Sequence, residues 1–170
     1  MKKVYCWAYA IGIALSLNSA AQASEAYVGC GQTELLHSNT SIKFVGAKET
    51  EDEVGDRREL YWHLKSLDGD FAGTFDVIST IIGGDTKTGH DVRVDGLLRL
   101  PNGNIFLLGR TSLEDATDTE RSGNAAQQVD LTVTGGTEEF ADASGGVTIT
   151  VPESDKNHLE NRPMTINLSC

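Results

Sequence analysis

Alternation of apolar and polar residues is the feature that most restricts the fold of this chain. Leu60, Trp62 and Leu64 alternate with more polar neighbours, which is a period of two. Seven segments show this period or an enrichment in β-branched and aromatic residues: 60–65, 71–82, 92–100, 104–111, 129–134, 147–151 and 164–169. Successive side chains of a strand point to opposite faces, so the pattern predicts strands. A weaker pattern over 41–45 predicts an eighth strand, and 27–28 a further short one.

No window of the sequence shows a sustained helical period with capping residues, so we predict an all-β chain. The sequence Pro101-Asn102-Gly103-Asn104 lies between two apolar runs and predicts a hairpin. An antiparallel chain of 170 residues closes as a barrel or a sandwich. An eight-stranded antiparallel barrel has an interior that holds side chains or one small ligand.

The first 23 residues have the pattern of a secretory signal peptide. Lys2 and Lys3 precede an uncharged apolar run over 4–17, and Ala21-Gln22-Ala23 is a small-x-small cleavage sequence. The run is short for a membrane span and no second one follows, although an uncleaved anchor is the alternative. We therefore expect a secreted or periplasmic protein, cleaved after Ala23, with no membrane insertion of the mature chain.

Acidic residues outnumber basic ones by 25 to 14, which gives a net charge of −11. Cleavage removes two lysines and no acid, so the net charge of the mature chain becomes −13. Nucleic acids and anionic membrane surfaces attract basic proteins, so this charge argues against both as partners.

Two acidic stretches, over 47–58 and 113–126, separate predicted strands. Clustered carboxylates suit a cation such as Ca²⁺, but neither stretch has the spaced ligands and central glycine of an EF-hand. Solvated loops are therefore expected, and no metal site is predicted. The predicted organisation is a signal peptide over 1–23, an N-terminal arm and acidic loop over 24–57, and a β-barrel domain over 58–170.

Two of the three cysteines remain after cleavage, Cys30 near the start of the mature chain and Cys170 at its end. An even pair in an oxidising compartment is more often a disulfide than two thiols, so we predict a Cys30–Cys170 bond. Cys170 shares strand parity with Met164, Ile166 and Leu168, which predicts that it faces the interior. The alternative is a nucleophilic thiolate, which needs an activating partner.

Common catalytic signatures are absent from the sequence, which has no Gly-x-Ser-x-Gly elbow, no His-Glu-x-x-His and no Gly-Lys-Ser/Thr phosphate loop. The four histidines, His37, His63, His90 and His158, lack metal-ligand spacing. His63 lies on the polar face of its predicted strand. It is either a general base or a surface or interface residue. No cofactor is expected, and no catalytic residue is assigned.

One predicted strand is apolar on both faces. Ile105 and Leu107 fill the interior if Phe106 and Leu108 point outwards. The outer pair then needs a cover, which is either a neighbouring subunit or another segment of the same chain.

The sequence VTGGTEEFADASGGV over 133–147 is the most distinctive local motif. Its glycines, including Gly135, Gly136 and Gly145, suit a turn or a close backbone approach. A phosphate nest is the alternative, but no Lys or Arg lies nearby. These residues predict a structural corner between two strands.

This motif resembles that of the allene oxide cyclase and dirigent-like barrels, which carry Gly-Gly-Thr/Ser-Gly-x-Phe/Tyr followed by a small residue and Gly. Glu138 stands where that pattern has its third glycine. The hairpin over 94–110 and the sequence Leu60-Tyr61-Trp62-His63 are similar to other strands of the superfamily. The resemblance covers residues 58–170.

The resemblance implies an eight-stranded barrel, often trimeric, with an apolar pocket. Members of the superfamily act without a cofactor, mainly by holding a reactive guest in one conformation. Arg110 stands where dirigent proteins have a Gly-Arg pair, which implies a pocket residue; an ordinary strand-end arginine is the alternative. Leu64 replaces an acid that dirigent proteins often have, and the cyclase's catalytic Glu has no counterpart here, so catalysis is not carried over.

Three classes of function remain. The preferred one is a secreted β-barrel that binds a small apolar molecule. The alternatives are a cofactor-free cyclase or isomerase of the allene oxide cyclase type, and a non-catalytic structural or interaction protein. An open interior favours the first two classes, whereas a filled interior with outward apolar patches favours the third.

Overall fold

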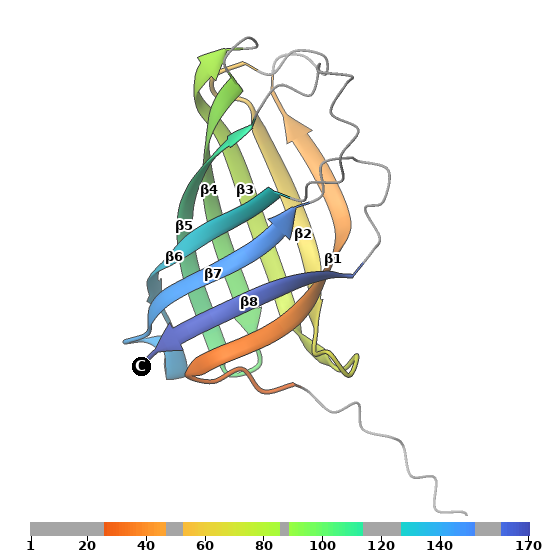
Figure 1. Ribbon diagram of the computed structural model, residues 1–170, viewed down its shortest axis with the longest axis vertical. Coiled ribbons are helices and arrows are strands. Elements are labelled where there is room, and N and C mark those ends of the chain that lie inside the picture. The colour runs from red at the N-terminus through yellow and green to blue at the C-terminus, as the bar shows by residue number, and fades with distance from the viewer. Residues whose placement is uncertain (1–25, 47–52, 86–88, 114–126, 152–160) are drawn as a thin grey trace, which may run out of the picture.

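The computed structural model describes residues 26–46, 53–85, 89–113, 127–151 and 161–170, and the predicted signal peptide lies outside them. Eight antiparallel strands form a closed barrel in chain order, with the last strand paired onto the first (Figure 1). They are β1 (Gly31–Val45), β2 (Arg57–Lys65), β3 (Phe71–Asp85), β4 (Gly89–Leu100), β5 (Gly103–Leu113), β6 (Gln127–Gly136), β7 (Ser144–Val151) and β8 (Arg162–Ser169). A 3-10 helix, η1 (Glu138–Phe140), connects β6 to β7. The predicted eight-stranded antiparallel barrel is confirmed.

Each of the seven clear strand patterns corresponds to a strand of the barrel. The predicted hairpin joins β4 to β5, with Leu100 opposite Gly103. The strands over 129–134, 147–151 and 164–168 are consecutive antiparallel neighbours. Their apolar stripes are buried in one shared core, which contains Val129, Leu131, Val147, Ile149, Met164, Ile166 and Leu168.

The N-terminal region differs from the prediction. Residues 24–57 were expected to form an arm and an acidic loop, with a weak strand over 41–45, whereas β1 is a complete barrel strand from Gly31 onwards. A register shift between Asn39 and Ser41 interrupts its period of two, because a bulge adds a residue to one strand of a pair. Pairing with both β2 and β8 holds this strand in place.

The β4–β5 and β6–β7 connections lie at the lower end of the barrel in Figure 1. Phe140 of η1 and Val28 of the N-terminal segment are fully buried there. Asn102 Nδ2 donates hydrogen bonds of 2.8 Å to the Val28 carbonyl and to the Glu139 carboxylate. The Tyr27 hydroxyl donates to the same carboxylate at 2.9 Å. This network ties the N-terminal segment to two lower turns.

The glycine-rich motif builds the same closed end. Gly136 ends β6, and a β-carbon there would collide with the backbone carbonyl of Phe140. Gly145 has a φ of 124°, a conformation that glycine adopts at little cost. Glu138, which replaces the third glycine of the superfamily pattern, has a φ of 56° and so takes the left-handed conformation itself. The predicted structural corner therefore rests on close packing at Gly136 and on backbone conformation at Gly145.

A disulfide joins Cys30, just before β1, to Cys170, just after β8, with the two Cα atoms 5.8 Å apart. The predicted bond is therefore present. Both cysteines are exposed, so the predicted interior position of Cys170 is wrong. The last strand ends at Ser169, and the alternation that buries Leu168 does not continue into the terminal residue.

The strands extend to different heights at the upper end of the barrel. β8 begins at Arg162, opposite His37, so the rest of β1 continues beyond its pairing with β8. On the other side, the pairing of β5 with β6 ends at Gly109 and Leu131, although β5 continues to Leu113. The first five strands therefore rise above β6, β7 and β8 in the described part of the chain (Figure 1).

The hydrophobic core fills the interior below this level. Phe75, Leu98, Ile105 and Ile166 have no exposed surface, and they come from four different strands. Any guest of the barrel must therefore sit above this core, among the inward side chains of the upper end.

Candidate ligand site in the upper barrel interior

Arg110, which the resemblance implied as a pocket residue, lies on the outside of the barrel. Ile105 and Leu107 of β5 are buried, whereas Phe106 and Leu108 are exposed. Arg110 has the same strand parity as the exposed pair and is exposed itself. It borders a shallow hollow of about 240 Å³ together with Ile82, Asp91, Val92 and Thr111.

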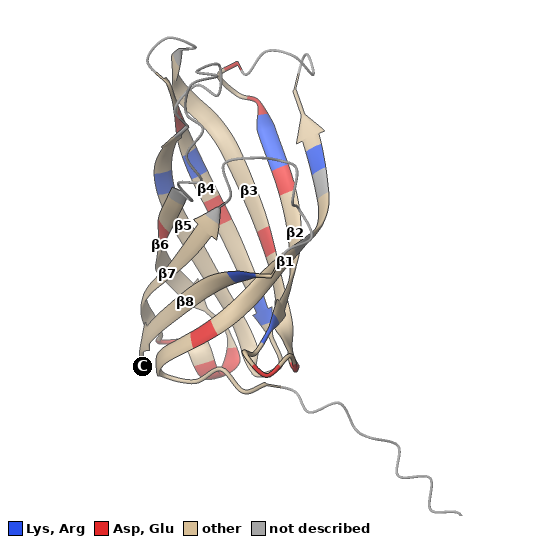
Figure 2. Cartoon of the chain, turned by 45° about the vertical axis from the view of Figure 1, so that its right-hand side comes forward, with Lys and Arg blue, Asp and Glu red and all other residues tan. Residues whose placement is uncertain are grey.

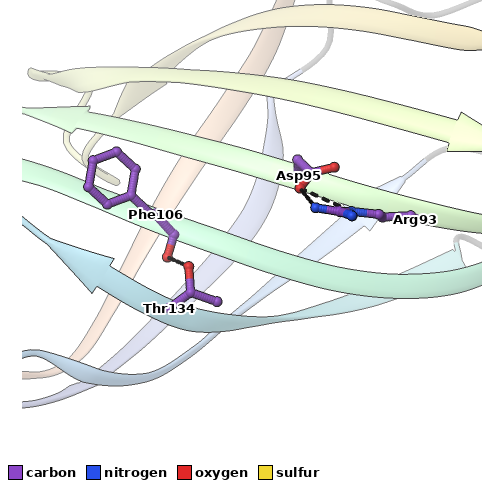
Figure 3. A network of polar contacts seen from close by, with 4 residues as sticks. All are labelled: Arg93, Asp95, Phe106 and Thr134. Carbon is purple, nitrogen blue, oxygen red and sulfur yellow. Dashed lines mark hydrogen bonds and ion pairs between the residues drawn. The ribbon is translucent and has the colours of Figure 1, made fainter.

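A larger hollow on the outer face, of about 460 Å³, is lined by Arg57, Ile78, Thr80, Ile82, Arg93 and Asp95. Two of its charged groups are paired with each other, since Arg93 Nη2 lies 2.7 Å from Asp95 Oδ1 (Figure 3). The third, Arg57, lies 3.8 Å from Glu59. Figure 3 also shows the Thr134 hydroxyl donating to the Phe106 carbonyl, at 3.2 Å. The outer surface of β4 to β6 thus combines ion pairs with exposed apolar side chains.

Acidic and basic strand residues differ in the faces of the barrel wall that they occupy. The strand carboxylates whose side chains the structure describes alternate with inward residues and so point outwards: Glu34, Glu59, Asp76, Asp91, Asp95 and Asp130. Basic residues occur on both faces, because Arg58 and Arg162 share the inward parity of Trp62 and Met164 on their strands, and both are half-buried. Figure 2 shows acidic and basic residues along the strands of the barrel. Among the described strand residues, the charged side chains with inward parity are therefore basic.

His37 of β1 points into the same part of the interior. It lies opposite Arg162 on one neighbouring strand and Leu64 on the other, and only 3% of its surface is exposed. Its ring stacks on that of Trp62, with centroids 4.2 Å apart and an angle of 20° between the planes. Trp62 in turn meets Phe75 edge-on at 5.4 Å. His37, Trp62 and Phe75 thus form an aromatic column inside the barrel, of which His37 is the polar member.

Burial lowers the pKa of His37 to about 4, because the charged imidazolium loses its hydration. A hydrogen bond to the backbone of Thr150 acts in the opposite direction, and the positive charge of Arg162 lowers the pKa further. The ring is therefore neutral at pH 7. Its Nε2 atom is buried and has no hydrogen-bond partner among the described residues.

Above His37, inward side chains remain accessible. Phe44 of β1 and Arg58 of β2 lie opposite each other, and the Arg58 guanidinium carbon is 5.6 Å from the centre of the Phe44 ring. The Phe44 side chain is 61% exposed although its strand parity points it inwards, and Leu60 beside it is only partly buried. An aromatic ring, an aliphatic side chain and a guanidinium therefore lie together on the inner face of the upper strands, and the aromatic ring is exposed.

Two further histidines lie on the described strands. His90, near the upper end of β4, is buried with the inward parity of Val92 and Val94, and its Nδ1 atom has no partner among the described residues. His63, the suggested general base, is exposed on the outside of β2, edge-on to Tyr61 at 5.5 Å. His158 and most of the two acidic stretches fall outside the described residues. Within those residues, no group of three or more His, Cys, Asp or Glu side chains is arranged to hold a metal ion.

Sequence patterns pointed to His63 and Arg110 and assigned no role to His37, Arg58 or Arg162. His37 was missed because only residues 41–45 of its strand were predicted, although Leu35 and His37 do keep a period of two. Arg58 precedes Leu60 by two residues, so strand parity alone would have placed it on the inner face.

No helix in the described ranges is long and apolar enough to cross a membrane. No protein-family model matches the chain, and no curated protein matches it in sequence.

Solved structures of several small barrels do match. A pyocyanin demethylase is 18% identical, with a TM-score of 0.58 over 81% of this chain and 99% of that one. The Diels-Alderase AbmU from Streptomyces koyangensis is 17% identical, with a TM-score of 0.59 over 81% of this chain and 63% of that one. AbnU, an exo-specific intermolecular Diels-Alderase, is 12% identical, with a TM-score of 0.56 over 81% and 97% of the two chains. The chain therefore shares the fold of these small barrels.

Proposed function

We propose that this protein holds a small apolar or aromatic molecule in the upper interior of its barrel. The carrying observation is Phe44, an inward aromatic side chain that is 61% exposed above an otherwise filled core. Water contact with an apolar ring is unfavourable, and a guest that covers it gains that free energy. Leu60, which is only partly buried, provides further apolar contact area below the ring.

The structural neighbours support a small-molecule function. Their names describe a demethylase of pyocyanin and enzymes of cycloaddition, which are activities on small organic molecules. A barrel that confines a flexible guest accelerates cyclisation by orientation alone. Cofactor-free cyclisation or isomerisation of the guest is therefore the second proposed function.

We also propose that the protein acts after export, in the periplasm or outside the cell. The basic start, the apolar run and the cleavage sequence over 1–23 form one signal, and the Cys30–Cys170 bond suits an oxidising compartment. Mass spectrometry of the exported protein tests this proposal, because cleavage after Ala23 predicts a mature chain that begins at Ser24.

A thermal-shift screen of aromatic compounds, fatty acids and oxylipins tests the binding proposal, followed by titration of each hit. Phe44→Ser should weaken binding about fivefold, since an aromatic contact contributes about 0.5–1.5 kcal/mol. Phe71→Ser is the matched control, because Phe71 is also exposed but begins β3 at the lower end. The proposal would be refuted by a screen without hits, or by equal effects of the two substitutions on the dissociation constant.

Incubation of each hit with the protein separates binding from reaction. Cyclisation or isomerisation leaves the mass of the guest unchanged but alters its chromatographic retention. If the guest is recovered unchanged after prolonged incubation with saturating protein, binding without reaction is the function.

We further propose that the exposed apolar residues of β5 support self-association, as a homotrimer. Phe106 is 43% and Leu108 38% exposed on the outer face, and Leu97 lies directly opposite Phe106 on β4. Sedimentation velocity tests this proposal: Phe106→Ser should shift the protein to monomers, whereas Phe44→Ser should not. A monomeric unsubstituted protein would refute it.

A further inference from the structure

We propose that His37 Nε2 accepts a hydrogen bond from the guest, so that the barrel selects planar molecules with an O–H or N–H donor. This inference rests on the proposed binding function and names the chemistry of its ligand. The observation behind it is an acceptor that is buried among apolar side chains and has no partner among the described residues.

The imidazole can present its lone pair at Nε2 only if the proton sits on the other nitrogen. His37 interacts with the backbone of Thr150, and Nε2 is the nitrogen left without a partner. The Nδ1–H group is therefore the one that donates to the Thr150 carbonyl. In the neutral ring this leaves Nε2 as an acceptor, which requires a donor from outside the described residues.

The aromatic column sets the orientation of such a guest. A donor approaches Nε2 in the plane of the imidazole, and this plane is within 20° of the plane of Trp62. A planar guest that donates in the same plane thus lies nearly parallel to the indole ring.

The surrounding charges favour an acceptor role for His37. Arg162 on β8 lies opposite it and Arg58 on β2 shares its inward face, while the described strand carboxylates point outwards. Both arginines already interact within the protein, and neither is a hydrogen-bond partner of Nε2. The positive charge of Arg162 disfavours a second proton on the His37 ring, which leaves the lone pair of Nε2 to the guest.

A matched pair of probes isolates the hydrogen bond. 2-Naphthol and 2-methoxynaphthalene have the same ring system, but only the alcohol donates a hydrogen bond. Their dissociation constants are measured by calorimetry on the full chain at pH 7. We expect the alcohol to bind about tenfold more tightly than the ether, because a buried acceptor without a donor costs about 1.4 kcal/mol or more.

Two variants assign the preference to His37. His37→Phe keeps an aromatic ring on Trp62 but has no acceptor, so both probes should bind with equal affinity. His37→Gln retains an amide that can bond to Thr150 and accept from the guest, so it should keep part of the preference even if the Phe variant does not fold. His63→Phe, on the outer face, should behave like the unsubstituted protein.

The outcomes separate the two proposals. If the two probes and all the screened compounds fail to bind, the proposed binding function is refuted and this inference is refuted with it. If both probes bind with equal affinity, only the inference is overturned, because solvent then satisfies Nε2. A preference that persists in His37→Phe would overturn it as well, since the acceptor would lie elsewhere.

Discussion

The stability of this protein should depend on pH through one buried side chain, His37. Its pKa is lowered to about 4 in the folded protein, against about 6.5 in an unfolded chain. The unfolded state therefore binds a proton between these two values while the folded state does not, and the free energy of unfolding falls as the pH decreases from about 6.5 towards 4. Stability that depends on neutral His37 is present above this window and lost within it.

The magnitude follows from the two pKa values. At pH 7 the histidine is neutral in the folded state and about three-quarters neutral in the unfolded state, so it contributes little. At pH 5 the unfolded histidine is mostly protonated and the folded one is not, which lowers the free energy of unfolding by about 2 kcal/mol relative to pH 7. Protonation of carboxylates at acidic pH changes the free energy of unfolding separately, and a variant without the imidazole retains that change.

Urea denaturation at pH 7 and pH 5 tests this reasoning. His37→Gln does not titrate, so its loss of stability between the two pH values should be about 2 kcal/mol smaller than that of the unsubstituted protein. His63→Gln is the control, because His63 is exposed on the outside of β2. Equal pH dependence of the His37→Gln variant and the unsubstituted protein would show that burial does not hold the ring neutral.

Three further substitutions test the fold. Replacing both Cys30 and Cys170 by Ser should lower the free energy of unfolding by about 4–5 kcal/mol in the chain-entropy account, and two free thiols in the exported protein would contradict the bond itself. Arg110→Ala should change stability by less than about 0.5 kcal/mol in the same urea assay, because the side chain is exposed; a large loss would reveal a buried partner. Phe140→Ala should cost about 3–5 kcal/mol, since it empties the lower end of the core, and a neutral effect would mean that this end is not packed.

Local patterns predicted the parts of the barrel that depend on neighbouring residues in the chain. The β4–β5 hairpin follows from its turn sequence, and the core stripes of β6, β7 and β8 follow from their period of two. Only residues 41–45 of the first strand were predicted, because the bulge near Asn39 breaks the period of two. Its position is determined by two partner strands, one of which lies at the far end of the sequence.

The candidate site was less predictable for a related reason. Which residues line the upper interior depends on where strand pairing ends, at His37 with Arg162 on one side and at Gly109 with Leu131 on the other. These positions depend on the relative lengths and registers of distant strands, which no local pattern contains. The resemblance pointed to Arg110 on β5, but strand parity with Phe106 places that side chain outside.

The order of the strands has a consequence for how the barrel assembles. Seven of the pairings join strands that are neighbours in sequence, whereas the pairing of β1 with β8 joins the two ends of the chain. A contact of such high sequence separation carries a large loop-closure entropy and forms late. The Cys30–Cys170 bond, across a separation of 140 residues, lies at this seam. Once oxidised, it makes the most distant pairing a local one, so a chain that unfolds with the bond intact should close its barrel again much faster than a reduced chain.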